Sequence, residues 1–198
     1  MKTKKFKIAV FASTRGTDFD AIIEEKKNGK MPNIEICFLF SNRKNCGAVE
    51  LAKKNNIPVE ILEPQKKEKR EDYDRKVFQI CQKQKIDLIV LVGYMRLFSP
   101  FFVKKFWRKI INIHPSLLPK FPGMDLDVHR AVLEASEKFS GMTIHFVDEG
   151  MDTGEIICQK KIEINKNETP ESLKKRVQDL EKKWYPEIIQ QFATGKIF

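Results

Sequence analysis

An amide and an imidazole stand two residues apart at Asn112 and His114, directly before the segment Pro115 to Pro119. The apolar run that contains them predicts a strand, and because side chains alternate along a strand, both should point to one face. An amide can stabilise an oxyanion while a neighbouring imidazole moves a proton, which is the chemistry of acyl transfer. The alternative is structural, with Asn112 bonded to local backbone and His114 a capped, structural imidazole.

The loop after the first expected strand, Ser13 to Phe19, has the composition of an anion site. Gly16 and small polar residues come just before a helix, where unpaired backbone N–H groups and the helix dipole favour a phosphate. The single glycine fits neither the P-loop nor the dinucleotide fingerprint. A plain helix start, with Thr17 as the capping side chain and Asp18 complementing the dipole, is the alternative.

The other histidines and the cysteines have no metal-ligand spacing. His129 is expected at the surface or as a helix cap, and His145 as a half-buried sheet residue. The acidic loop Asp148 to Gly154 lacks the spacing of an EF-hand, so we expect no metal. Scattered cysteines are typical of a reducing compartment and predict a cytoplasmic protein: Cys37, Cys46, Cys81 and Cys158.

Short apolar runs alternate with charged helical stretches, which is typical of a parallel sheet covered by helices. Strands are expected at 6–13, 34–41, 59–62, 88–93 and 110–113, with helices at 18–28, 47–56 and 71–83. A helix near 128–137, strands at 143–147 and 156–164, and a helix from 171 to 183 or on to 192 follow. The predicted fold is α/β, a single-domain Rossmann-like unit with a mostly parallel sheet and helices on both faces. Ligands bind such sheets beyond the carboxyl ends of the strands, where both loops above should lie.

The net charge of the chain raises the question of whether it binds nucleic acid. The 198 residues carry 37 Lys+Arg against 27 Asp+Glu, a net charge of +10, yet only eight of the basic residues are arginine. Dispersed lysines favour a solvated surface over a nucleic-acid footprint. No window approaches the roughly 18 apolar residues of a membrane helix, and the short apolar run before Ser13 favours a strand over a secretory signal.

Together these motifs resemble the phosphoribosylglycinamide formyltransferase family, folate-dependent enzymes of purine synthesis. The likeness covers nearly the whole chain, and Asn112 to Gly123 is its most specific part. Four further segments match in the family's order: Gly16 to Phe19 (phosphate loop), Gly93 to Pro100 (folate-lining segment), His145 to Gly154 (acidic loop) and Gln178 to Pro186 (C-terminal helix).

The resemblance implies one formyltransferase domain over residues 1–198, with a nucleotide- and phosphate-binding half to about residue 100 and a folate-binding, catalytic half after it. Asn112, His114 and Asp152 would be catalytic, and Glu181 would bind the acceptor's ribose. The phosphate would lie on Gly16, Thr17 and Asp18. The folate would contact Asn112 and five further residues: Arg70, Met95, Arg96, Leu97 and Phe98.

The implied co-substrate is 10-formyltetrahydrofolate and the implied acceptor is glycinamide ribonucleotide, with no metal, no membrane and no nucleic acid, in a monomer or homodimer. One departure is Asp18, which stands where the family commonly has Asn. A carboxylate beside a phosphate is unfavourable unless only its backbone N–H faces the anion.

Other enzymes that handle formyl groups share the three catalytic residue types, so the acceptor decides between them. Methionyl-tRNA formyltransferases resemble the acidic loop, and the charge of +10 suits tRNA. Formyltetrahydrofolate hydrolases use water, and an amino sugar is a further possible acceptor. The first two families carry an additional domain that this sequence does not display, which favours glycinamide ribonucleotide. A non-catalytic protein that keeps the pocket is the remaining alternative.

Overall fold

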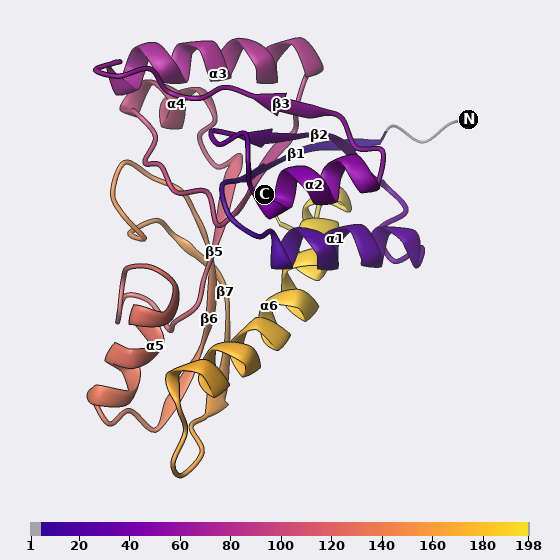
Figure 1. The fold of residues 1–198 in the computed structure, drawn as a ribbon. Coiled ribbons are helices and arrows are strands. Elements are labelled where there is room, and N and C mark those ends of the chain that lie inside the picture. Colours follow the sequence, from indigo (N-terminus) through magenta and orange to yellow (C-terminus); the bar gives the residue numbers. More distant parts are fainter. Residues whose placement is uncertain (1–4, 198) are drawn as a thin grey trace.

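The computed structural model describes residues 5–197, and one seven-stranded sheet forms its centre (Figure 1). The strand order is β3-β2-β1-β4-β5-β6-β7. Strands β1 to β5 pair in parallel, whereas β6 and β7 join antiparallel to β5 and to each other. The strands are β1 (Phe6–Ala12), β2 (Ile34–Ser41), β3 (Val59–Ile61), β4 (Leu88–Val92), β5 (Ile110–His114), β6 (Phe139–Phe146) and β7 (Ile156–Glu163).

Helices cover both faces of the sheet (Figure 1). Helices α1 (Thr17–Lys27), α2 (Gly47–Lys54) and α6 (Pro170–Ala193) pack on one face, and α3 (Arg70–Gln84) and α4 (Pro100–Lys105) on the other. Helix α5 (Asp125–Glu134) packs against α6 near the antiparallel strands. The α/β class predicted from the sequence is confirmed.

The alternation of side chains along β1 explains the two cores. Ile8 and Val10 belong to the cluster under α1, α2 and α6, whereas Ala9 and Phe11 belong to the cluster under α3 and α4. All four side chains are fully buried. A strand buried on both faces is an unbroken apolar run, which is why the sequence identified it.

Three elements differ from the sequence prediction. Helix α4 was not expected, because six residues after Pro100 carry too short a pattern to detect. Strand β6 begins at Phe139 rather than Thr143, because the polar, small pair Ser140 and Gly141 hid its first half. Helix α5 begins at Asp125 and ends at Glu134, earlier than expected at both ends. Helix α6 runs on through Pro186 to Ala193, close to the longer of the two predictions.

In the described part of the chain, no helix has both the length and the apolar character needed to cross a membrane.

Candidate active site

A cavity of about 430 Å³ opens at the carboxyl ends of β1, β4 and β5. The strand order reverses between β1 and β4, and this reversal is where open α/β sheets bind ligands. Ten of the residues predicted for the site line it: Thr17, Asp18, Met95, Arg96, Leu97, Phe98, Asn112, His114, Asp152 and Glu181. Two others, Gly16 and Arg70, are not among the lining residues, and Arg70 is exposed at the start of α3.

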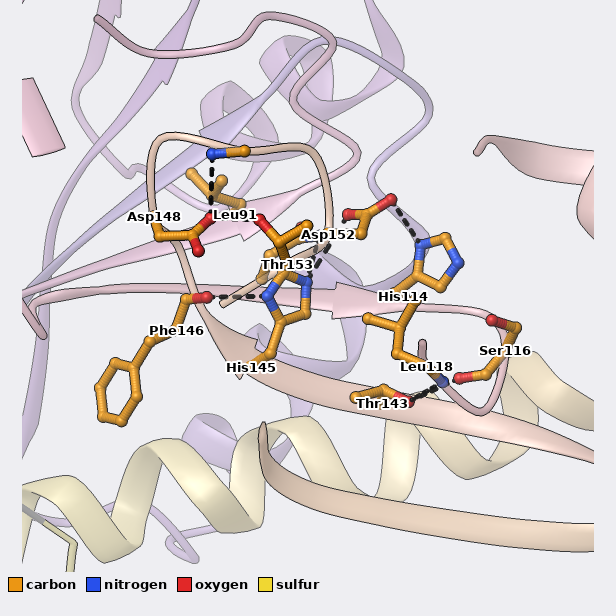
Figure 2. Close-up of polar contacts among 12 residues, drawn as sticks. Leu91, His114, Ser116, Leu118, Thr143, His145, Phe146, Asp148, Asp152 and Thr153 are labelled. Carbon is orange, nitrogen blue, oxygen red and sulfur yellow. Dashed lines mark hydrogen bonds and ion pairs between the residues drawn. The ribbon is translucent and has the colours of Figure 1, made fainter. Parts of the chain in front are cut away.

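Asn112 is held by a histidine on the neighbouring strand. The two residues are direct partners in the register of β5 and β6, and Asn112 Nδ2 lies 3.2 Å from His145 Nε2. His145 Nδ1 lies 2.8 Å from the carbonyl oxygen of Phe146 (Figure 2), which can only accept, so Nδ1 carries the hydrogen of the neutral ring. Nε2 then accepts one N–H of the Asn112 amide, and the second N–H is left for a ligand.

His114 has both ring nitrogens in contact with the protein. Nε2 lies 2.9 Å from the carbonyl oxygen of Phe121 and donates to it, and Nδ1 lies 3.4 Å from Oδ2 of Asp152 (Figure 2). The neutral ring can therefore take up a proton only at Nδ1, the atom that faces the carboxylate. Burial lowers the pKa of His114 below its ordinary value, while the Phe121 carbonyl and Asp152 act to raise it. The free ring is thus available as a base.

The loop after His114 is fixed to β6. The hydroxyl of Thr143 donates to the Ser116 carbonyl at 2.6 Å and accepts from the Leu118 N–H at 3.0 Å (Figure 2). Both contacts are buried. These two hydrogen bonds fix the loop that follows His114. The imidazole is therefore positioned by strand β5 before it and by this loop after it.

Asp152 stands between the two histidines. Its Oδ1 lies 3.7 Å from His145 Nε2, its Oδ2 accepts from the Gly123 N–H at 3.5 Å, and its side chain is 12% exposed. Burial acts to raise the pKa of Asp152, but the protonated forms of His145 and His114 and the Gly123 N–H outweigh it, so the pKa lies below its ordinary value. A carboxylate at this place keeps its charge and favours the protonated form of His114.

Helix α1, which follows the loop after β1, begins without a side-chain cap. Gly16 is the N-cap residue with φ of 80°, and the interpretation of Thr17 as the capping side chain is wrong because Thr17 is already the first helical residue. A Cβ atom at Gly16 would lie 2.9 Å from the Cβ of Ala48, so α2 packs directly on the loop. The backbone N–H groups of this helix start therefore remain free of any side-chain acceptor.

Two carboxyl groups lie beside this helix start. Burial raises the pKa of Asp18 to about 6, against the opposing effect of Lys182. Burial, and then the charge of Asp18, raise the pKa of Glu181 well above its ordinary value. Both groups therefore favour the neutral form far more than exposed carboxyls do.

The segment after β4 forms an apolar wall of the cavity. Phe98 stacks on Tyr94 with the ring centres 5.3 Å apart, and the guanidinium carbon of Arg96 lies 4.3 Å from the ring centre of Tyr73. The Met95 N–H donates to the hydroxyl of Ser13, which ties this wall to the loop after β1. A flat aromatic ligand with polar edges fits such a wall.

Sequence analysis missed two histidines that line the cavity. His145 lies in a strand as predicted, but it is buried rather than half-buried, and its contacts with Asn112 and Asp152 make it part of the site. His129 was expected at the surface or as a helix cap; that prediction is wrong, because His129 is only 1% exposed and lies inside α5. The sequence feature that could have predicted its burial is the apolar helix face that His129 shares with Val128 and Val132. Among residues 5–197, no three His, Cys, Asp or Glu side chains are grouped to hold a metal ion.

Comparisons with known proteins identify the family of the chain. The formyl transferase family model matches residues 6–189. The chain is 40% identical over 185 residues to phosphoribosylglycinamide formyltransferase of Bacillus subtilis, covering 93% of each chain. It is 39% identical to the chloroplastic phosphoribosylglycinamide formyltransferase of Arabidopsis thaliana, covering 98% of this chain and 68% of the relative.

A solved structure extends the likeness to the fold. The crystal structure of glycinamide ribonucleotide transformylase 1 from Symbiobacterium toebii superposes with a TM-score of 0.92 at 32% identity, covering 100% of this chain and 92% of that one. The resemblance drawn from the motifs is confirmed. The chain belongs to the formyl transferase family.

Proposed function

We propose that this protein transfers a formyl group from 10-formyltetrahydrofolate to the primary amine of glycinamide ribonucleotide. The observation that carries the proposal is the convergence of Asn112, His114 and Asp152 on one cavity. Relatives that carry the name of this activity match the chain at 39 to 40% identity over nearly its full length. In the reaction the amine bonds to the formyl carbon, the bond to the folate nitrogen breaks, and a proton passes from the amine to that nitrogen.

Asn112 has the position of an oxyanion donor. His145 occupies one of its two amide hydrogens, and the other is directed by that contact rather than free to rotate. A donor that is fixed before the reaction stabilises developing negative charge without reorganisation. We assign the formyl oxygen, as it becomes an oxyanion, to this second N–H.

His114 has the position of a proton carrier. Its neutral ring accepts a proton only at Nδ1, where the Asp152 carboxylate lies 3.4 Å away and stabilises the resulting positive charge. The same proton can then leave for the departing nitrogen. Asp152 thus acts through His114, and the transfer requires no metal.

The two substrates are assigned to the two ends of the cavity. We assign the acceptor's phosphate to the loop of Gly16, Thr17 and Asp18, because free backbone N–H groups at a helix start bind anions. The ribose would lie near Glu181. The folate is assigned to the apolar wall of Met95, Arg96, Leu97 and Phe98, together with Asn112. Arg70 would reach the folate only from outside the cavity lining.

The proposed partners are these two small molecules, in a monomer or homodimer. The proposed location is the cytoplasm, although the relative from Arabidopsis thaliana is a chloroplastic protein.

The test is a formyl-transfer assay with 10-formyltetrahydrofolate and three acceptors in parallel. Glycinamide ribonucleotide should be formylated, charged initiator tRNA should not, and formate release in the absence of an acceptor should be slow. Formylation of tRNA but not of the ribonucleotide would assign the protein to a different acceptor. Formate release as fast as transfer would make water the acceptor.

A further inference from the structure

Two carboxyl groups face the cavity from two packed helices. Asp18 lies in the first turn of α1 and Glu181 in the middle of α6, and these helices pack against each other. Both side chains line the cavity. Neither belongs to the group of Asn112, His114 and Asp152, so their chemistry is not used by formyl transfer itself.

The two carboxyl groups lack hydrogen-bond partners within residues 5–197. Oδ1 of Asp18 is buried and has none. Glu181 is only 6% exposed, and its side chain makes no hydrogen bond to the described residues. A buried ionised carboxylate without donors is strongly disfavoured, and two of them side by side repel each other. The pair therefore needs a proton, a ligand or both.

The cations near Asp18 and Glu181 are too few to neutralise both these two carboxyl groups and a bound phosphate. Lys174 is already ion-paired with Asp125 of α5, beside the buried, uncharged His129. Lys182 is exposed, and Arg15 is exposed at the cavity's edge. Two cations on α6 act on the pair electrostatically, Lys182 on both carboxyl groups and Lys174 on Glu181. The pair in turn acts on the buried Tyr185 of the same helix.

We propose that the pair binds the anionic acceptor together with a proton, so that Asp18 enters the complex as a neutral carboxyl group that donates its O–H to an acceptor oxygen. This inference rests on the proposed function, because it takes a phosphorylated acceptor as the ligand. A neutral carboxyl has the same shape as an amide and also offers a donor, which removes the repulsion between a carboxylate and a phosphate. The acceptor should consequently bind less tightly as the pH rises.

The raised pKa values agree with this arrangement. The pKa of Asp18 is already about 6 in the free protein because the side chain is buried, and a second negative charge at the phosphate position can only raise it. Proton uptake on binding is the direct consequence of such a rise.

The experiment is calorimetric titration of the whole protein with glycinamide ribonucleotide at pH 7.5, in two buffers of different ionisation enthalpy. Asp18→Asn keeps the shape and the donor but cannot titrate. Asp20→Asn removes one charge from the same helical turn at an exposed position outside the cavity and is the matched control. The protons exchanged by the ligand's own amine and phosphate are common to all variants.

The expected result is that the wild type and Asp20→Asn take up close to one proton more than Asp18→Asn. The wild-type affinity should also fall about tenfold from pH 7 to pH 8 relative to Asp18→Asn. Equal proton uptake by the wild type and Asp18→Asn would overturn the inference. If Asp18→Asn does not fold, Asp18→Ser, also neutral and a donor, gives the same comparison.

The same samples distinguish this inference from the proposed function. Formylation of glycinamide ribonucleotide by the wild type, combined with equal proton uptake in all variants, would leave the function standing and remove the role of Asp18. A wild type that neither binds nor formylates the ribonucleotide would contradict the proposed function, and with it the ligand that the inference assumes.

Discussion

The two ends of the cavity are built differently. At the strand ends, the polar atoms of Asn112 and His114 already contact protein groups, at 3.2 Å from His145 and 2.9 Å from the Phe121 carbonyl. At the end formed by α1, α5 and α6, Oδ1 of Asp18 and Nδ1 of His129 are buried with no partner in the described chain. The catalytic side chains at the first end are held in place by protein contacts, and we call it the complete end; the second, where these two buried atoms have no protein partner, is the incomplete end.

This difference indicates which property each end controls. Groups that are fixed before the substrate arrives stabilise the transition state without reorganisation, so their loss should lower kcat. Buried polar groups without partners usually have a ligand, water or ion that completes them. Changes at that end should therefore alter acceptor binding and the response to pH.

The largest effect is expected at the complete end. His114→Ala should lower kcat by about 100- to 10,000-fold and Asn112→Ala by about 100- to 1,000-fold, with KM values nearly kept, because one removes the proposed proton carrier and the other the proposed oxyanion donor. The double variant should lose less than the product of the two, since both groups serve one transition state. Steady-state kinetics measure this, with exposed Lys54→Ala as the control. Near-full turnover in both variants would rule out the mechanism.

The sequence alone predicted part of the structure at the complete end. The strands were apolar runs, and the period of two placed Asn112 and His114 on one face, as both now line the cavity. The family likeness supplied Asp152, which no local spacing identified.

Other parts depend on packing between distant segments. His145 joins the site because antiparallel pairing sets it opposite Asn112, a register that no local pattern encodes. His129 is buried because α5 packs on α6, so its polar neighbours in sequence were misleading. Gly16 is not among the cavity-lining residues, and Ala48 of α2 packs against it.

Asp152→Asn should give the next largest loss, on the order of 100-fold in kcat, since a charge about this close to an imidazolium is worth a few kcal/mol. The amide keeps the shape of the loop but no longer favours the protonated ring, so the pKa of His114 should fall further below its ordinary value. The acid limb of the pH–rate profile should move to lower pH. An unmoved limb would mean that Asp152 does not act through His114.

His129 offers a test of stability at the incomplete end. Burial lowers its pKa from 6.5 to about 4, so below pH 6.5 the unfolded state binds a proton that the folded state refuses, and stability falls as pH falls from about 6.5 towards 4. Between pH 7 and pH 5 this group should cost about 2 kcal/mol of unfolding free energy. Urea unfolding at both pH values should show that extra loss in the wild type and not in His129→Gln. The same pH dependence in both proteins would contradict the buried, neutral state.

The smallest effect is expected at the loop of Gly16, Thr17 and Asp18, which we propose to bind the acceptor's phosphate. Gly16→Val places a side chain against Ala48 at a residue with φ of +80°, so the loop must shift and its N–H groups lose their alignment. The KM for glycinamide ribonucleotide should rise about tenfold, given strain of order 1 to 3 kcal/mol, while the KM for the folate stays near the wild-type value. Inorganic phosphate should inhibit the wild type competitively against the ribonucleotide and inhibit the variant less.

Gly29→Val separates backbone strain from the loss of the site. Gly29 has φ of +76°, nearly the same as Gly16, but nothing lies within 4 Å of a Cβ there, and it lies at the far end of α1. Both variants should therefore lose stability through the same unfavourable backbone conformation, and only Gly16→Val should also raise the acceptor's KM. Equal rises in both KM values for Gly16→Val, or an equal rise in the acceptor's KM for Gly29→Val, would place the phosphate elsewhere and remove the division between the two ends of the cavity.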